Sequence, residues 1–213
     1  ILIAKMRTKS KTYQIAYFDE LTGLPTKAKH RQDIDEKLRN MKREYAYVSV
    51  EVDNFEYVKE MYGYAYGNYL IKYIADGLSK EVLPDELLSH TSEQRFGLLM
   101  QYDGDEELRR RLLEIFHRIG QIPPNEDVDS PYTVTFTCGA YRIQSGGESA
   151  IKVRERANIA REEARRLFEN NIEFYNERLQ QRRAEQEQFE FEMRQALEKN
   201  QFVVYMQPKY SAI

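Results

Sequence analysis

Cysteine is almost absent from this chain of 213 residues, in which Cys138 is the only one. A single cysteine cannot form an internal disulfide, and this is typical of proteins in a reducing compartment. Long apolar runs are also missing, because no stretch approaches the roughly 20 residues that a membrane-spanning helix needs. The apolar start at Ile1–Ile3 is too short for a signal peptide. We therefore expect a cytoplasmic location.

The chain also lacks an excess of charge of one sign. The 35 acidic residues slightly outnumber the 32 basic ones, so no overall positive field favours nucleic acid as a partner. Apolar residues make up 41 % and charged residues 31 % of the chain, compared with typical values of roughly 45–50 % and 25 %. This composition permits a core and indicates that part of the chain is solvated helix.

Hydrophobic periodicity predicts an α/β domain before Glu148. Alternating apolar residues predict a strand over Tyr45–Val52. Further strands are expected over Leu87–Thr91 and Phe96–Tyr102, which form a hairpin, and over Tyr132–Ile143. Helices are expected between and after these strands, over Pro25–Met41, Val58–Leu78 and Glu106–Ile119, and after the Gly146-Gly147 pair. The resulting order, α-β-α-β-β-α-β-α, is typical of a mixed sheet covered by helices.

Neither glycine nor proline occurs between Glu148 and Gln207, and so long a charged stretch predicts extended helix. From Ile172 to Ala196, eight positions spaced by three and four form a seam, of which six are apolar or aromatic. One interpretation is a solvated helix that docks a single stripe on its own domain. The other is a coiled-coil-like connector that relays a signal or dimerises.

Several short motifs resemble, in the same order, those of the diguanylate cyclase (GGDEF) family. The resemblance extends over Tyr17–Tyr175 and implies an α/β fold with a central mixed, mostly antiparallel sheet of the nucleotide-cyclase palm (ferredoxin-like) type. The motifs are Asp19-Glu20-Leu21-Thr22-Gly23-Leu24-Pro25, Glu51-Val52-Asp53-Asn54-Phe55, Tyr62-Gly63-Tyr64-Ala65-Tyr66-Gly67-Asn68, Ser92-Glu93-Gln94-Arg95-Phe96, Thr135-Phe136-Thr137-Cys138-Gly139-Ala140 and Ala157 to Arg165. The hairpin Ser92–Phe96 stands where the family carries G-G-D-E-F.

A second resemblance begins near the C-terminus. Phe191–Leu197 and Phe202–Lys209 are similar to the opening helix and first strand of EAL-type phosphodiesterases. The two resemblances divide the chain into a lead-in helix (1–16), a GGDEF domain (17–175), a connector helix (176–200) and the first strand of a truncated EAL domain (201–213). They imply a downstream EAL domain, an upstream sensor or membrane segment, and a homodimer.

Four basic residues precede the first acid of the chain: Lys5, Arg7, Lys9 and Lys11. They fit either a solvated lead-in helix or the cytoplasmic flank of a membrane helix.

The positions that the resemblance assigns to metal chemistry are altered. In the family, metal ions clamp the triphosphate of GTP and neutralise charge in the transition state. One metal carboxylate falls on Glu51, which is still an acid, and another on Gln94, which is neutral and a poor Mg²⁺ ligand. The glutamate that follows in the family is Arg95 here, and a guanidinium repels a divalent cation and cannot act as a base.

The positions that would contact nucleotide also differ from the family. Ser92 and Glu93 replace two hairpin glycines that let the backbone approach the nucleotide, and the guanine-reading pair falls on Lys59 and Asn68. The inhibitory R-x-x-D site is missing, since Leu83 and Glu86 stand at its ends.

We therefore expect no cyclase activity, no catalytic residue and no cofactor. Vestigial nucleotide-binding positions are expected at Lys59, Asn68, Ser92, Glu93 and Arg165. The alternative is a divergent cyclase that uses GTP and Mg²⁺, with Glu51 and Asp53 as metal ligands.

Two smaller questions stay open. Glu51 and Asp53 are either metal ligands or solvent-facing acids. Arg95, Lys59 and Arg165 either form a metal-free cationic pocket for a phosphate or are neutralised by Glu51 and Glu93 as ion pairs.

Two other side chains are expected to be structural. His30 lies on the apolar stripe of its expected helix, so it is expected to be partly buried rather than a metal ligand. Cys138 lies in an expected strand without a histidine partner, so it is expected in the core.

Overall fold

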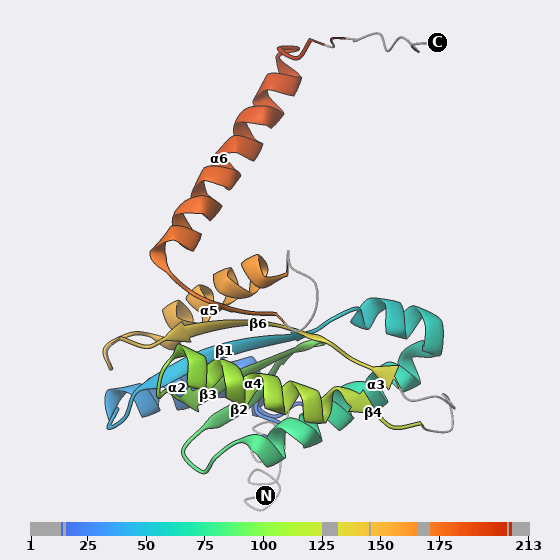
Figure 1. Cartoon of the computed structure of the whole chain (residues 1–213), viewed down its shortest axis with the longest axis vertical. Helices are drawn as coiled ribbons and strands as arrows, with labels where there is room; N and C mark the ends of the chain where they lie inside the picture. The colour runs from blue at the N-terminus through green and yellow to red at the C-terminus, as the bar shows by residue number, and fades with distance from the viewer. Residues whose placement is uncertain are drawn as a thin grey trace, which may run out of the picture. The chain divides into compact units, whose positions relative to one another are not determined.

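The computed structural model describes residues 14, 16–124, 132–144, 146–165, 171–203 and 205. Compact units are formed by Ile1–Tyr175 and by Asn176–Ile213. The first unit contains a five-stranded sheet with the order β2-β3-β1-β6-β7 (Figure 1). Its strands are β1 (Tyr45–Val52), β2 (Leu87–Ser92), β3 (Arg95–Gln101), β6 (Phe136–Arg142) and β7 (Asn171–Phe174). Neighbouring strands are antiparallel except β6 and β7, which are parallel.

Helices cover both faces of this sheet. On one face α3 (Phe55–Glu81) and α4 (Asp105–Ile119) enclose the larger core, and on the other α2 (Lys27–Arg39) and α5 (Ala150–Ala164) enclose a smaller one. This arrangement confirms the mixed, mostly antiparallel α/β sheet with flanking helices that the motifs implied. Cys138 is fully buried in the larger core, and His30 is buried in α2, as expected.

Strand β1 is the centre of the sheet, and all eight of its residues are buried. Its alternating valines, Val48, Val50 and Val52, face the larger core, whereas Tyr45 and Tyr47 belong to the smaller one. The predicted strand Tyr45–Val52 is therefore confirmed. Because α5 covers the second face, the polar residues that alternate with the valines are buried rather than solvated.

The predicted hairpin is confirmed as β2 and β3. Ser92 pairs with Arg95 across a turn formed by Glu93 and Gln94, after a register shift between His90 and Ser92. The amide of Val52 donates a 2.9 Å hydrogen bond to the Gln94 carbonyl. The hairpin turn is thus held directly against the end of β1.

The single strand predicted over Tyr132–Ile143 is wrong in part. The chain forms two strands there, β5 (Tyr132–Thr133), which pairs with β4 (Gln121–Ile122) in a separate two-stranded sheet, and β6. Between β5 and β6, the amide of Val134 donates to the Gly120 carbonyl and the Thr135 carbonyl accepts from Asp53. The β-rich sequence is therefore shared between two sheets.

The prediction that a helical seam begins at Ile172 is also wrong. Ile172 lies in β7, is 4 % exposed and pairs with Cys138 of β6. The second compact unit contains α6 (Glu177–Glu198), which begins after Asn176, whose side chain accepts a hydrogen bond from the Leu179 amide. A short strand and a helix cap therefore interrupt the charged stretch, which lacks glycine and proline but is not one helix.

Several expectations concern residues that the structure does not describe. The basic residues before residue 12, and most of the strand expected over 201–213, lie outside the described residues. Within the described part of the chain, no helix combines the length and the hydrophobicity needed to cross a membrane.

Candidate functional site: a carboxylate surrounded by guanidinium groups

Glu51, the acid at the expected metal position, lies near the end of β1 and is only 2 % exposed. Its carboxylate accepts a 2.7 Å hydrogen bond from Nε of Arg95 and a 2.9 Å hydrogen bond from the Gln94 amide, and it forms an ion pair with Arg165. The Nε atom of Arg161 lies 3.3 Å from the same carboxylate. The expectation that Glu51 is a solvent-facing acid is therefore wrong, because α5 and the hairpin cover it.

Arg161 reaches Glu51 because α5 packs unusually close to β6. A Cβ atom placed on Gly139 would lie 2.1 Å from the Arg161 backbone nitrogen, so only glycine permits this approach. The Arg161 side chain is 6 % exposed and donates hydrogen bonds to Ser49 and to Asn158. Burial lowers the pKa of its guanidinium to about 10.

The side chain of Asp53, the second acid of the expected metal pair, forms hydrogen bonds with two threonines. Its two carboxylate oxygens accept hydrogen bonds from the hydroxyl groups of Thr135 and Thr137, at 2.8 Å and 2.7 Å. Asn54, which follows it, has φ of 55° and precedes the first turn of α3. Asparagine tolerates this left-handed conformation better than most residues.

Magnesium does not fit this donor set. It requires oxygen ligands in near-octahedral geometry, and the Glu51 oxygens already accept hydrogen bonds from donors that carry positive charge or an amide proton. Among the described residues, no group of three histidine, cysteine, aspartate or glutamate side chains could hold a metal ion.

Lys59, at the first of the two expected guanine-reading positions, is tied to the hairpin. Its ammonium group lies 2.5 Å from Glu93 and 2.9 Å from Glu56, and these hydrogen bonds raise its pKa. The aliphatic part of Lys59 lies over Gly67, where a Cβ atom would be 2.8 Å from Cγ of the lysine. The lysine therefore occupies the space between α3 and the hairpin.

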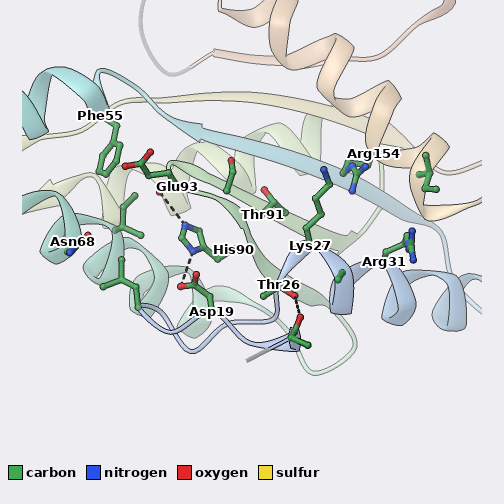
Figure 2. Close-up of a pocket in the computed structure, with 16 residues that line it drawn as sticks. Asp19, Thr26, Lys27, Arg31, Phe55, Asn68, His90, Thr91, Glu93 and Arg154 are labelled. Carbon is green, nitrogen blue, oxygen red and sulfur yellow. Dashed lines mark hydrogen bonds and ion pairs between the residues drawn. The ribbon is translucent and has the colours of Figure 1, made fainter. Parts of the chain in front are cut away.

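A cavity of about 840 Å³ lies beside the hairpin and includes Asn68, the second expected guanine-reading position, and Ser92. Figure 2 shows His90 in its middle, with Asn68 toward one end. The Nδ1 atom of His90 lies 3.1 Å from the Asp19 carboxylate, and Nε2 lies 3.3 Å from the Glu93 carbonyl. Hydrogen bonds from Thr22 and His90 outweigh burial and lower the pKa of Asp19.

Glu86, at one end of the expected inhibitory motif, is buried and bound to other parts of the protein. Its side chain is fully buried and forms a two-point ion pair with Arg111 at 2.5 Å and 2.7 Å. It also accepts hydrogen bonds from the amides of Leu83 and Gln101. Glu86 therefore joins α4 to β3 and to the turn before β2.

The structure brings together Glu51, Gln94, Arg95 and Arg165, four of the residues named from the sequence. It places Lys59 and Glu93 in a separate ion pair. The arrangement of these cations is that of ion pairs with Glu51 and Glu93 rather than of an open cationic pocket. Arg161 was not identified from the sequence, although it lies four residues before Arg165 and therefore on the same face of α5.

Comparison with known proteins places this chain in a family. The family described as "Diguanylate cyclase, GGDEF domain" matches residues 16–171. The uncharacterized protein sll1895 of Synechocystis is 26 % identical over 96 % of this chain and 30 % of its own length. MucR of Pseudomonas aeruginosa, named a bifunctional diguanylate cyclase/cyclic di-GMP phosphodiesterase, is 24 % identical over 97 % of this chain and 30 % of its own length. The chain thus spans less than a third of these relatives.

Solved structures with the same fold include GGDEF domains. The GGDEF domain of TpbB (YfiN) from Pseudomonas aeruginosa superposes with a TM-score of 0.70 at 19 % identity, over 80 % of this chain and 99 % of that one. An S helix-GGDEF-EAL structure of LapD from Vibrio cholerae, bound to c-di-GMP, superposes with a TM-score of 0.62 at 17 % identity, over 82 % and 40 %. With the family match over most of its length, this chain belongs to the GGDEF diguanylate cyclase domain family.

Proposed function

We propose that this chain is a GGDEF domain without cyclase activity, which serves as a regulatory and dimerisation module in a bacterial cyclic-di-GMP signalling protein. The observation that carries the proposal is the environment of Glu51. Three guanidinium groups, from Arg95, Arg161 and Arg165, surround this one carboxylate. The place where a divalent cation would bind therefore already has an excess of positive charge.

The electrostatic cost of adding a metal there is large. Two unit charges about 4 Å apart interact by about 4 kcal/mol at the effective dielectric constant of about 20 near a protein surface. A divalent cation beside Glu51 would be repelled by more than one guanidinium, and one carboxylate does not offset that repulsion. Without a metal, the charge that develops during phosphoryl transfer loses its main stabilising group.

The expected guanine-binding position supports the same proposal. Lys59 fills the space over Gly67 and is held there by Glu93 of the hairpin turn. A guanine ring would have to displace this ion pair, and Glu93 would place a negative charge beside an incoming triphosphate. Binding of GTP in the orientation required for cyclisation is therefore disfavoured both at its guanine ring and at its triphosphate.

A regulatory role in a longer protein is supported by how far the similarity extends. The family match ends at residue 171, whereas the alignment with the bifunctional protein MucR covers 97 % of this chain. Helix α6 follows the GGDEF domain directly. We propose that α6 connects the domain to an EAL phosphodiesterase domain, and that the protein is a cytoplasmic homodimer with a sensor or membrane segment upstream.

A divergent but active cyclase is the second candidate. It is favoured by one observation, namely that acids remain at Glu51 and at Asp53, where the family has its D-x-D pair. In this candidate, Mg²⁺ would displace the guanidinium groups from Glu51 when GTP binds.

Titration with Mn²⁺, followed by electron paramagnetic resonance of the free ion, tests the proposal. We expect no binding at millimolar Mn²⁺ in the natural chain and a gain of binding in Gln94→Asp/Arg95→Glu, which restores the acids of the family. The matched control is Arg118→Glu, a charge reversal of the same kind on α4 far from β1 in the sequence. Binding to the natural chain as tight as to the double variant would contradict the proposal.

A further inference from the structure

Helices α2 and α5 together present a positively charged surface at one end of the 840 Å³ cavity. Lys27 and Arg31 lie one turn apart on α2, and Ile151 and Arg154 lie one turn apart on α5. Figure 2 shows Lys27 rising from α2 toward Arg154. The side chain of Ile151 is 42 % exposed. We call these four residues the α2–α5 surface.

The positive charges of the α2–α5 surface have no counter-ion. Within the described part of the chain, none of its three cations has an ion-pair or hydrogen-bond partner. The acids that line the same cavity, Asp19 and Glu93, are bound to His90 and Lys59. Three uncompensated cations beside an exposed apolar side chain favour a protein partner that carries acids next to an apolar residue.

Helix α6 carries a segment of the opposite charge, residues 185–192. It contains four glutamates and no basic residue, since the nearest basic residues in the sequence are Arg183 and Arg194. Phe189 and Phe191, within the segment, are each 60 % exposed. The segment therefore combines negative charge with aromatic side chains that need a partner to be buried.

Three of the four glutamates keep their negative charge uncompensated. Neutral side-chain amides donate to them at 2.9–3.0 Å, namely those of Gln181, Gln186 and Gln188 to Glu185, Glu190 and Glu192. The fourth, Glu187, forms an ion pair with Arg183. A hydrogen bond from an amide leaves a carboxylate charged, so it can still pair with a cation elsewhere.

Two of these glutamates and one phenylalanine share one face of α6. Glu185, Phe189 and Glu192 are spaced by four and three residues, which places them on the same side of a helix. They extend over about 10 Å, because an α-helix rises 1.5 Å per residue. An aromatic ring thus lies between two carboxylates, in the pattern that the α2–α5 surface would complement with one apolar residue among cations.

We infer that this face of α6 binds the α2–α5 surface of a second copy of the chain. Phe189 packs against Ile151, and the two glutamates pair with the cations, in the case of arginine through two parallel hydrogen bonds. Each copy carries both surfaces, so a two-fold pair makes the contact twice. The inference rests on the proposed homodimer and names the surfaces that form it.

A coiled coil of two α6 helices satisfies these side chains less well. Phe189 and Phe191 are two residues apart and lie on nearly opposite sides of the helix, so one partner helix cannot cover both. In a parallel pair, Glu185 and Glu192 would also lie near the same residues of the partner, and like charges repel. The α2–α5 surface offers them cations instead.

Sedimentation equilibrium of the full chain tests the inference. We expect a dimer whose Kd rises at least tenfold in Arg31→Glu/Arg154→Glu, and equally in Glu185→Lys/Glu192→Lys, because attraction becomes repulsion. When all four substitutions are combined, the pairs form again with their signs exchanged. The Kd should then return to within about threefold of the natural value.

The matched control is Lys42→Glu/Lys152→Glu, which changes the net charge as much as Arg31→Glu/Arg154→Glu does. Both lysines are exposed and neither lines the cavity. This variant should change the Kd by less than about twofold, because the effect requires charges at the contact. Circular dichroism and the Tm establish that each variant is folded.

The remaining outcomes separate this inference from the proposed function. A dimer that Arg31→Glu/Arg154→Glu leaves intact would overturn the two surfaces and leave the homodimer standing, and if Glu185→Lys/Glu192→Lys alone weakened it, α6 would pair with α6. Failure of the combined variant to recover would also overturn the pairing. A natural chain that stays monomeric at about 100 μM would overturn both the surfaces and the homodimer, whereas the absence of cyclase activity is tested independently.

Discussion

The Arg161 guanidinium lies 3.3 Å from the Glu51 carboxylate, and the exposed fractions of the two side chains are 6 % and 2 %. This ion pair connects α5 to the central strand on the smaller-core face of the sheet. Arg95 in the hairpin and Arg165 at the end of α5 form two further ion pairs with the same carboxylate. The carboxylate at the position that the resemblance assigns to a metal ligand is thus part of the packing between a helix and the sheet.

Glu51→Gln should destabilise the domain by about 3–5 kcal/mol, because removing one partner of a buried ion pair leaves the other charge uncompensated. Urea denaturation followed by circular dichroism measures the loss. The control is Glu44→Gln, whose ion pair with Arg142 is exposed, with 56 % of each side chain accessible. That change should cost no more than about 1 kcal/mol. Equal effects of the two substitutions would show that Glu51 is not a buried counter-ion.

Glu86→Gln should also destabilise the domain, since Glu86 is the fully buried partner of Arg111 and accepts two backbone hydrogen bonds. We expect a loss of about 3–5 kcal/mol in the free energy of unfolding. If Glu86 were instead a remnant of a ligand site, its replacement would leave the urea midpoint near that of the natural chain. The exposed pair Glu107–Arg110 offers a control, because Glu107→Gln should change the midpoint very little.

His30 should make the stability of the domain depend on pH. Its pKa is about 3 in the folded state and about 6.5 in the unfolded chain. Between these values the unfolded chain binds a proton that the folded chain does not, so stability falls as the pH falls below 6.5. The slope contributed by His30 is about 1.4 kcal/mol per pH unit in the middle of this range.

His30→Leu provides the comparison, because it replaces the titrating imidazole with an apolar side chain that suits the buried position. Between pH 6.5 and pH 4.5 the natural chain should lose more of its free energy of unfolding than the variant does. Urea denaturation at each pH measures the difference. Parallel pH profiles for the two proteins would mean that His30 titrates normally in the folded state.

Much of the fold follows from local sequence patterns. The alternation of Tyr45–Val52 and the two short apolar runs around Glu93 predict β1, β2 and β3, and the structure confirms them. The strand at Ile172 could not be predicted in this way, because it has only four residues and lies within charged, helix-favouring sequence. Its pairing with Cys138 depends on a partner more than 30 residues earlier in the chain, which local periodicity does not report.

The site was predictable as a set of replaced residues, but its contacts were not. Gln94 and Arg95 can be recognised as departures from the family motif, whereas the burial of Glu51 depends on how closely α5 approaches β6 at Gly139. A strand with alternating polar residues predicts one solvated face, and only the covering helix reverses this. Arg161 reaches Glu51 because of the same close approach of α5 to β6.

The proposed absence of cyclase activity is the central claim, and product formation tests it most directly. The full chain is incubated with GTP and either Mg²⁺ or Mn²⁺, and cyclic-di-GMP is measured by liquid chromatography, beside an active GGDEF cyclase as a positive control. With the guanidinium groups of Arg95, Arg161 and Arg165 around Glu51, we expect no cyclic-di-GMP above the level of a protein-free reaction. Turnover of GTP to cyclic-di-GMP by the natural chain, lost in Glu51→Gln/Asp53→Asn, would contradict the account.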